Sequence, residues 1–105
     1  MASARRTNGA SRYARPMAPT EGTPVTILGR DTCEDTVRCL ALLQRHGVAY
    51  TYRHVDEDAQ ADAWIRRLNG GGWVTPTILI GDPERPDQIL REPTNHDLEA
   101  ALGLA

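Results

Sequence analysis

The sequence lacks several residue types, and each absence restricts what the chain can be. Among its 105 residues there is no lysine and no phenylalanine. Arginine therefore carries all of the permanent positive side-chain charge, and an apolar core has to be built from Leu, Ile, Val, Ala and two Trp. Hydrophobic residues make up 40% of the chain, which predicts one modest core in a single domain.

Cysteine is also scarce. The only two cysteines, Cys33 and Cys39, do not form a Cys-x-x-Cys motif, and one pair is too few for a disulfide framework, so we expect a cytoplasmic protein. His46, His54 and His96 are scattered and do not complete the close spacing of a zinc site. The residues therefore predict no bound metal.

Long apolar runs and a basic body are missing as well. The longest uninterrupted apolar stretch is residues 39–43, far below the roughly 20 residues that span a membrane, and there is no signal-peptide core. Residues 23–105 carry 8 Arg against 13 acids, whereas nucleic-acid binding needs clustered positive charge. We therefore expect neither a membrane nor a nucleic acid as partner.

Residues 1–22 differ from the rest of the chain. They hold four Arg against one Glu, many small residues and no periodic apolar face, so we expect a disordered basic tail followed by a domain over 23–105. Three interpretations of the tail stay open: a plain tail, an organelle transit peptide, or a protein that in fact begins at Met17.

Hydrophobic periodicity divides the domain into seven segments. Short β-branched or alternating runs predict strands, and apolar residues at three-to-four spacing predict helices, with Gly47 as the stop of the first helix. The strands are expected at 25–28, 48–55, 76–80 and 88–91, and the helices at 33–46, 59–68 and 95–102.

The resulting order is β-α-β-α-β-β-α. A helical connection makes the first two strands parallel, and a short turn makes the last two antiparallel. A four-stranded mixed sheet flanked by helices is the thioredoxin fold, which is therefore the α/β fold expected for this chain.

Several segments in this order resemble the glutaredoxins, and among them the mycoredoxins and related redoxins of high-GC bacteria. The resemblance covers about residues 24–102. The segments that carry it are the strand leading to Cys33 at 25–33, the strand and acidic turn at 47–58, Asn-Gly-Gly at 69–71, Thr-Pro-Thr at 75–77 and Glu-Pro-Thr at 92–94.

Chemistry and resemblance together make Cys33 the candidate nucleophile. The thiolate is the reactive form, and a helix N-terminus lowers a cysteine's pKa through its unpaired N–H groups and partial positive charge. Arg30, where the family often has Lys, is expected to add positive charge. Thr36 stands at the position of the second cysteine of the dithiol relatives, which makes the motif a monothiol Cys-Glu-Asp-Thr. Its hydroxyl either donates to the Cys33 sulfur or has no chemical role.

Other residues near Cys33 are expected to oppose or avoid the chemistry. Glu34 and Asp35 favour the helix start but raise the pKa of a neighbouring thiol. Cys39 lies about 9 Å further along the helix at 1.5 Å per residue, beyond the Cα separation of about 7 Å that a disulfide tolerates. We therefore expect Cys39 to be a buried structural residue.

The resemblance also implies a binding loop for a small thiol. It implies a cis Thr75–Pro76 peptide bond, with the Thr75 backbone free to pair with an extended substrate; the alternative is that Pro76 opens a strand in trans. Trp73 stands where relatives often have Arg, and forms either a wall beside Cys33 or part of the core. Thr94 matches the family's thiol-ligand segment, although a helix N-cap explains it equally well.

The preferred interpretation is a monomeric monothiol oxidoreductase acting on oxidised protein substrates. Its co-substrate would be a low-molecular-weight thiol, glutathione or mycothiol. Two alternatives stay open. One is a thioredoxin-fold binding module that has lost redox activity, and the other is iron–sulfur cluster binding with one cysteine per subunit.

Overall fold

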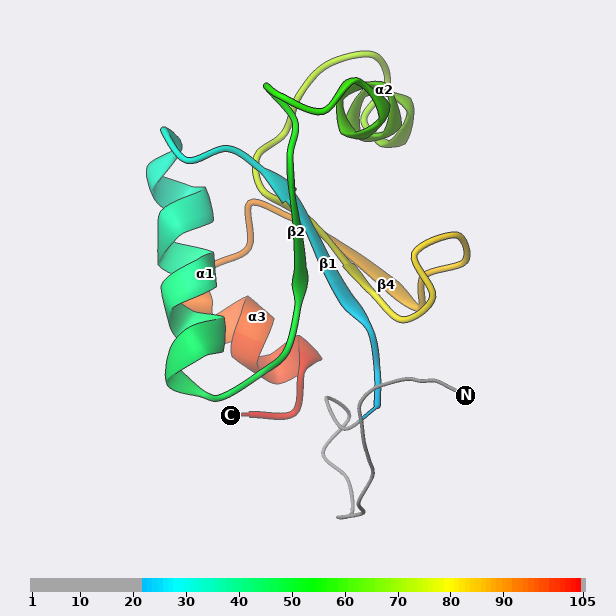
Figure 1. Ribbon diagram of the computed structural model, residues 1–105. Coiled ribbons are helices and arrows are strands. Elements are labelled where there is room, and N and C mark those ends of the chain that lie inside the picture. Colours follow the sequence, from blue (N-terminus) through cyan, green and yellow to red (C-terminus); the bar gives the residue numbers. More distant parts are fainter. Residues whose placement is uncertain (1–21, 105) are drawn as a thin grey trace.

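A computed structural model describes residues 22–104. It contains seven elements in the predicted order, coloured along the chain in Figure 1. These are β1 (Val25–Gly29), α1 (Glu34–Arg45), β2 (Thr51–His54), α2 (Ala59–Leu68), β3 (Thr77–Ile80), β4 (Gln88–Arg91) and α3 (Asn95–Ala101). The tail predicted for residues 1–22 lies, except for its last residue, outside the described residues.

The four strands form one mixed sheet in the order β2-β1-β3-β4. β1 pairs with β2 in parallel and with β3 antiparallel, and β3 pairs antiparallel with β4. The predicted parallel first pair and antiparallel last pair are both confirmed. This is the thioredoxin-like fold expected from the sequence.

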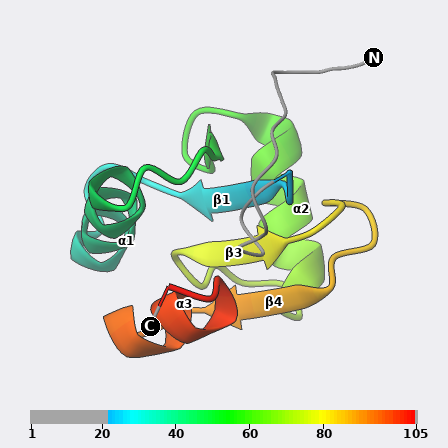
Figure 2. The same cartoon turned by 90° about the horizontal axis from the view of Figure 1, so that it is seen from below.

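The helices cover the two faces of the sheet unequally. α1 and α3 lie on one face and α2 on the other, as the two views in Figures 1 and 2 show. Alternate side chains of a strand point to opposite faces, so Ile27 packs under α1 and α3 whereas Leu28 packs under α2. Full burial of such a side chain contributes about 1.5–3 kcal/mol to folding.

Four strand boundaries differ from the prediction, of which the ends of β1 at Gly29 and of β2 at His54 each differ by a single residue. β2 begins at Thr51, because the Val48 N–H is engaged with the Leu43 carbonyl at 2.9 Å and closes the end of α1 instead of joining the sheet. β3 begins at Thr77 and not at Pro76, which has no N–H to donate to the ladder. Gly47 has a φ of +68° directly after α1, as a helix-ending glycine does.

Helix starts are capped in different ways. The Asp58 carboxylate accepts from the backbone N–H groups of Gln60 and Ala61 at the start of α2, and the Thr94 hydroxyl accepts from Asp97 at the start of α3. At the start of α1 the N-cap residue is Cys33, which makes no side-chain capping bond. The first turn of α1 thus leaves N–H groups beside a thiol. Over the described residues, no helix is long and apolar enough to cross a membrane.

Candidate active site around Cys33

The turn between β1 and α1 presents Cys33 at one end of the sheet. Its backbone is extended, with φ −94° and ψ 120°, and its N–H donates to the Arg30 carbonyl at 3.2 Å. The side chain is half-buried. Cys33 therefore sits at the N-cap, the position that the sequence predicted for the reactive thiol.

The thiol faces the loop that precedes β3. Cys33 Sγ donates to the Thr75 carbonyl oxygen at 3.4 Å, across 42 residues of sequence. The Thr75–Pro76 peptide bond is cis, and Pro76 is buried. The fold thus brings the start of α1 and the Thr-Pro loop together, two segments that the resemblance had implicated separately.

Hydrogen bonds control the ionisation of Cys33. Burial raises the pKa of the thiol, but bonds from the Thr75 and Thr36 side chains and from the backbone N–H groups of Thr36 and Asp35 together hold that pKa below its ordinary value. The Sγ–H···O contact with Thr75 belongs to the neutral thiol, because a thiolate has no proton to donate. Ionisation exchanges this contact for bonds that the sulfur accepts.

Thr36 is fully buried under the thiol. Its Oγ1 has no hydrogen-bond partner within the ordinary distance limits, apart from its contribution to the Cys33 thiolate. The side chain packs against Gly29, where an added Cβ would approach its Oγ1 and Cγ2 to 2.7 Å. An unpaired buried hydroxyl is costly, and a thiolate at Cys33 would satisfy it.

The two acids after Cys33 do not give its thiol a raised pKa in net result. The Asp35 carboxylate pairs with Arg38 at 3.1 Å, one turn further along α1. The Asp35 backbone N–H is among the groups that lower the pKa of Cys33. The net pKa of Cys33 is lowered, so hydrogen bonding outweighs whatever opposition the Glu34 and Asp35 charges provide.

Arg30 and Trp73 lie against each other. The Arg30 guanidinium carbon is 5.3 Å from the Trp73 ring centroid, and that of Arg66 is 5.4 Å away. Trp73 Nε1 donates to Asp62 at 2.7 Å, and the ring packs on the core under α2. Of the two interpretations for Trp73, the structure thus favours the packed one. Arg30 is engaged by that ring, and the groups that lower the pKa of Cys33 most are hydrogen-bond donors.

Thr94 and Cys39 occupy structural positions. Thr94 caps α3, with its Oγ1 accepting from the Asp97 N–H at 3.0 Å. Arg38 ties α1 to the segment around Thr94, because it donates to the Pro93 carbonyl at 2.9 Å. Cys39 is fully buried in the core, as predicted, and burial raises the pKa of its thiol.

The chain is similar to known proteins in both sequence and fold. A family model described as glutaredoxin matches residues 25–83, which is more than half of the chain. The chain belongs to the glutaredoxin family. It is also similar to the crystal structure of a glutaredoxin from Archaeoglobus fulgidus, with 19% identity, 88% of this chain and 98% of that chain covered, and a TM-score of 0.61. That likeness shows a shared fold. No curated protein sequence matches the chain.

Family membership indicates thiol–disulfide oxidoreductase chemistry. Glutaredoxins use glutathione-type thiols as co-substrate, and their substrates are thiols and protein disulfides. In this glutaredoxin the elements that meet at the end of the sheet are the turn before α1 and the Thr-Pro loop before β3. The thiol–disulfide chemistry that the family indicates therefore agrees with the geometry around Cys33.

Sequence reasoning missed a polar cluster beside Cys33 in this glutaredoxin. The Tyr52 hydroxyl donates to Asp31 at 2.8 Å, and His54 Nε2 lies 3.4 Å from the same carboxylate. The Tyr52 and His54 rings contact each other edge to face. Burial, the bond to Asp31, and the charges of Asp31, Asp56 and Cys33 raise the pKa of Tyr52. The alternation of Tyr52 and His54 on one strand face was the available signal.

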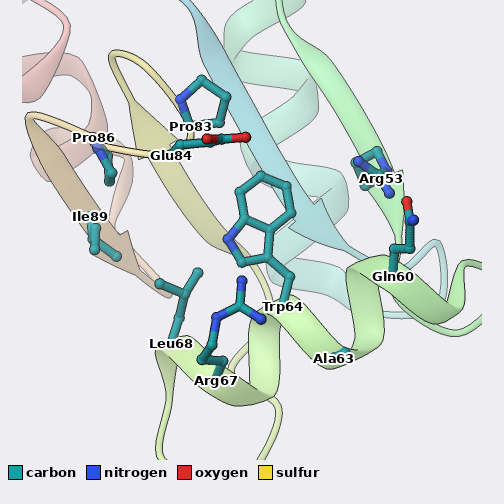
Figure 3. A pocket seen from close by; sticks show the side chains of 10 residues that line it. All are labelled: Arg53, Gln60, Ala63, Trp64, Arg67, Leu68, Pro83, Glu84, Pro86 and Ile89. Atoms are coloured by element: carbon teal, nitrogen blue, oxygen red, sulfur yellow. The ribbon is translucent and has the colours of Figure 1, made fainter.

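A groove of about 670 Å³ lies elsewhere on this glutaredoxin, between α2 and the loop that joins β3 to β4. Figure 3 shows Trp64 in its centre, with Arg67 and Leu68 below it. None of the seven residues predicted for the site lines it. In the part of the chain that the structure describes, no three His, Cys, Asp or Glu side chains gather as a metal site would require.

Proposed function

We propose that this chain is a monothiol glutaredoxin that removes a low-molecular-weight thiol from mixed disulfides on proteins. One observation carries the proposal. Cys33 combines a lowered pKa with a position at the N-cap of α1, facing the Thr75–Pro76 loop. A resolving cysteine would stand three residues after Cys33, and that position is occupied by Thr36. The second cysteine of the chain, Cys39, is buried.

The proposed cycle needs one cysteine and no further oxidant or reductant. The Cys33 thiolate attacks the small-thiol sulfur of a protein–S–S–R disulfide, so that a Cys33–S–S–R bond forms and the protein thiolate leaves. A second R–S⁻ then attacks the R-side sulfur of that bond. This step releases R–S–S–R and restores the Cys33 thiolate. The net reaction converts protein–S–S–R and one R–S⁻ into protein–S⁻ and R–S–S–R, so the incoming R–S⁻ is the reductant.

The residues around Cys33 have distinct roles in this proposal. Thr36 stabilises the thiolate, and the Thr75 backbone pairs with the extended substrate beside Pro76. Arg30 is held against Trp73, which packs under α2, and Thr94 caps α3, so these three residues support the surroundings of Cys33 without contacting its sulfur. The small thiol is glutathione or mycothiol, and the mycoredoxin-like Glu-Pro-Thr at 92–94 is the reason for including mycothiol.

The direct test is turnover of one peptide carrying either thiol as a mixed disulfide. We expect release of the peptide thiol with glutathione or mycothiol as reductant. Cys33→Ser should abolish it, and Cys39→Ala, the matched control, should retain it. If the folded wild-type protein releases neither thiol, the chain is a redox-inactive binding module. If Cys39→Ala is as inactive as Cys33→Ser, the monothiol cycle is wrong.

A further inference from the structure

The Thr75–Pro76 loop acts on the reactive thiol and is held in place by other parts of the chain. The Thr75 carbonyl oxygen accepts from Cys33 Sγ at 3.4 Å, and the Thr75 side chain is among the groups that lower the pKa of the thiol. Both effects need Thr75 close to a sulfur that is 42 residues away in the sequence. The loop lies between α2 and β3 and belongs to neither. Its position therefore depends on contacts from neighbouring elements.

A buried hydroxyl at the start of β3 holds the first side of the loop. Thr77 is fully buried, and its Oγ1 donates to the Val74 carbonyl oxygen at 2.6 Å. The same Oγ1 accepts from Nδ2 of Asn69 at 3.2 Å. A hydroxyl has one proton to donate and lone pairs that accept. The bond from Asn69 therefore leaves the Thr77 proton for Val74.

Asn69 is itself held in one orientation. Its Nδ2 also donates to the Ile65 carbonyl oxygen at 2.8 Å, and its Oδ1 accepts from Nε of Arg91 at 2.7 Å. Arg91 donates in addition to the Leu68 carbonyl oxygen at 2.9 Å, at the C-terminal end of α2, where a positive charge is favourable. Turning the Asn69 amide over would place its NH₂ group against the guanidinium and lose these bonds. A continuous path of hydrogen bonds thus leads from β4 to the loop.

The second side of the loop is held from the end of β4. The Glu92 N–H, directly after β4, donates to the Pro76 carbonyl oxygen at 2.9 Å. Glu92 has a φ of +47°, a conformation that a residue other than glycine keeps only where its surroundings hold it. Val74 and Pro76, on either side of Thr75, are thus both fixed through their carbonyl oxygens.

We infer that Asn69 and Thr77 are positioning residues, which hold the Thr75–Pro76 loop where Thr75 meets the Cys33 sulfur. The inference rests on the proposed function for the reaction that this position serves. In the described part of the chain, neither residue is among the groups that hydrogen-bond the sulfur, so both act through Thr75. A small shift of Thr75 matters, because hydrogen bonds weaken steeply as their geometry departs from the preferred values.

The pH dependence of Cys33 alkylation tests the inference without turnover. Thr77→Val keeps the shape of the buried side chain and removes both of its hydrogen bonds. We expect alkylation at pH 7 to slow about fivefold, the factor that corresponds to one lost hydrogen bond of ordinary strength. At a pH high enough to form the thiolate fully, the rate should match that of the wild type. Thr77→Ser, which keeps the hydroxyl, should restore the wild-type pH profile.

Two further variants make the test independent of Thr77→Val alone. Asn69→Ala changes a half-buried residue outside the core and should also slow alkylation at pH 7 but not at high pH. Thr26→Val is the matched control, because it removes a hydroxyl from a buried threonine near the start of β1, and its pH profile should be that of the wild type. A wild-type profile in either folded loop variant, or an equal change in Thr26→Val, overturns the inference. Slowing by the same factor at every pH overturns it as well.

Turnover of the mixed-disulfide peptide separates this inference from the proposed function. If the wild-type protein does not turn over the peptide but the variants change alkylation as expected, the oxidoreductase is rejected and the positioning role stands. If the wild-type protein turns over the peptide and alkylation is unchanged in the variants, the positioning role alone is rejected.

Discussion

At the scale of single residues, the reactivity of Cys33 depends on a balance between burial and hydrogen bonding. Burial disfavours the thiolate, while the Thr36 and Thr75 side chains and the first N–H groups of α1 favour it. Thr36 has a second part in this balance, because its own buried hydroxyl is unpaired unless the sulfur accepts from it. The Thr36 hydroxyl therefore stabilises the Cys33 thiolate, and the thiolate in turn gives that buried hydroxyl a hydrogen-bond partner.

Replacing Thr36 by valine separates these contributions. Thr36→Val keeps the shape that packs against Gly29 and removes the hydroxyl, so alkylation of Cys33 at pH 7 should slow about fivefold, for a bond worth about 1 kcal/mol. The free energy of unfolding should stay equal or rise, because a buried unpaired hydroxyl is lost. Thr36→Ser, the matched variant that keeps the hydroxyl, should retain the alkylation rate. Unchanged reactivity in Thr36→Val would remove Thr36 from the mechanism.

At the scale of elements, β1 and α1 meet at a contact that admits no additional atom. Gly29 ends β1 under Thr36, and an added Cβ would lie 2.7 Å from two atoms of that side chain. Gly29→Ala should therefore lower the free energy of unfolding by about 1–3 kcal/mol, measured by urea denaturation. Gly72→Ala is the control, since its Cβ would meet nothing within 4 Å. Equal stability of the two variants would show that α1 moves away from β1 freely.

The elements were the most predictable part of the molecule. Strand and helix order followed from hydrophobic period, and the N-cap position of Cys33 followed from the break after β1. The start of β2 was less predictable, because the Val48 N–H bonds to Leu43 and only the packed end of α1 reveals that competition. The Asp35–Arg38 pair lies at i,i+3 spacing and was predictable from the sequence.

At the scale of the whole molecule, tertiary contacts decide what the sequence left open. Trp73 was expected either beside Cys33 or in the core, and Asp62, which holds its Nε1, is 11 residues away on α2. Arg38 on α1 likewise donates to the Pro93 carbonyl before α3, and the two residues are 55 positions apart in the sequence. Neither arrangement has a local sequence signature.

Carboxylates distributed over the molecule predict how it responds to acid. The bond from Arg53 lowers the pKa of Asp58, and bonds from Arg66 and Trp73 lower that of Asp62. Both carboxylates bind protons more weakly in the folded state than in the unfolded state. The stability that they contribute is therefore fully present above the ordinary aspartate pKa of about 3.9. It is lost as the pH falls through their lower pKa values in the folded state. The urea concentration at the midpoint of unfolding should therefore decrease when the pH falls below about 4.

The matched variants test this assignment. Asp58→Asn with Asp62→Asn should be less stable at neutral pH and lose less on acidification, whereas Glu84→Gln should follow the wild-type acid dependence. An unchanged acid slope in the double variant would assign the acid response to other groups.

The fold lowers the pKa of Cys33 and so favours its thiolate form. The most direct measurement is the pH dependence of its alkylation in the folded protein, followed by mass spectrometry, with buried Cys39 as internal control. We expect Cys33 to react with an apparent pKa clearly below that of a free cysteine, about 8.5, while Cys39 stays unmodified. An apparent pKa at or above that value would contradict the account and leave the chain as a binding module on a glutaredoxin fold.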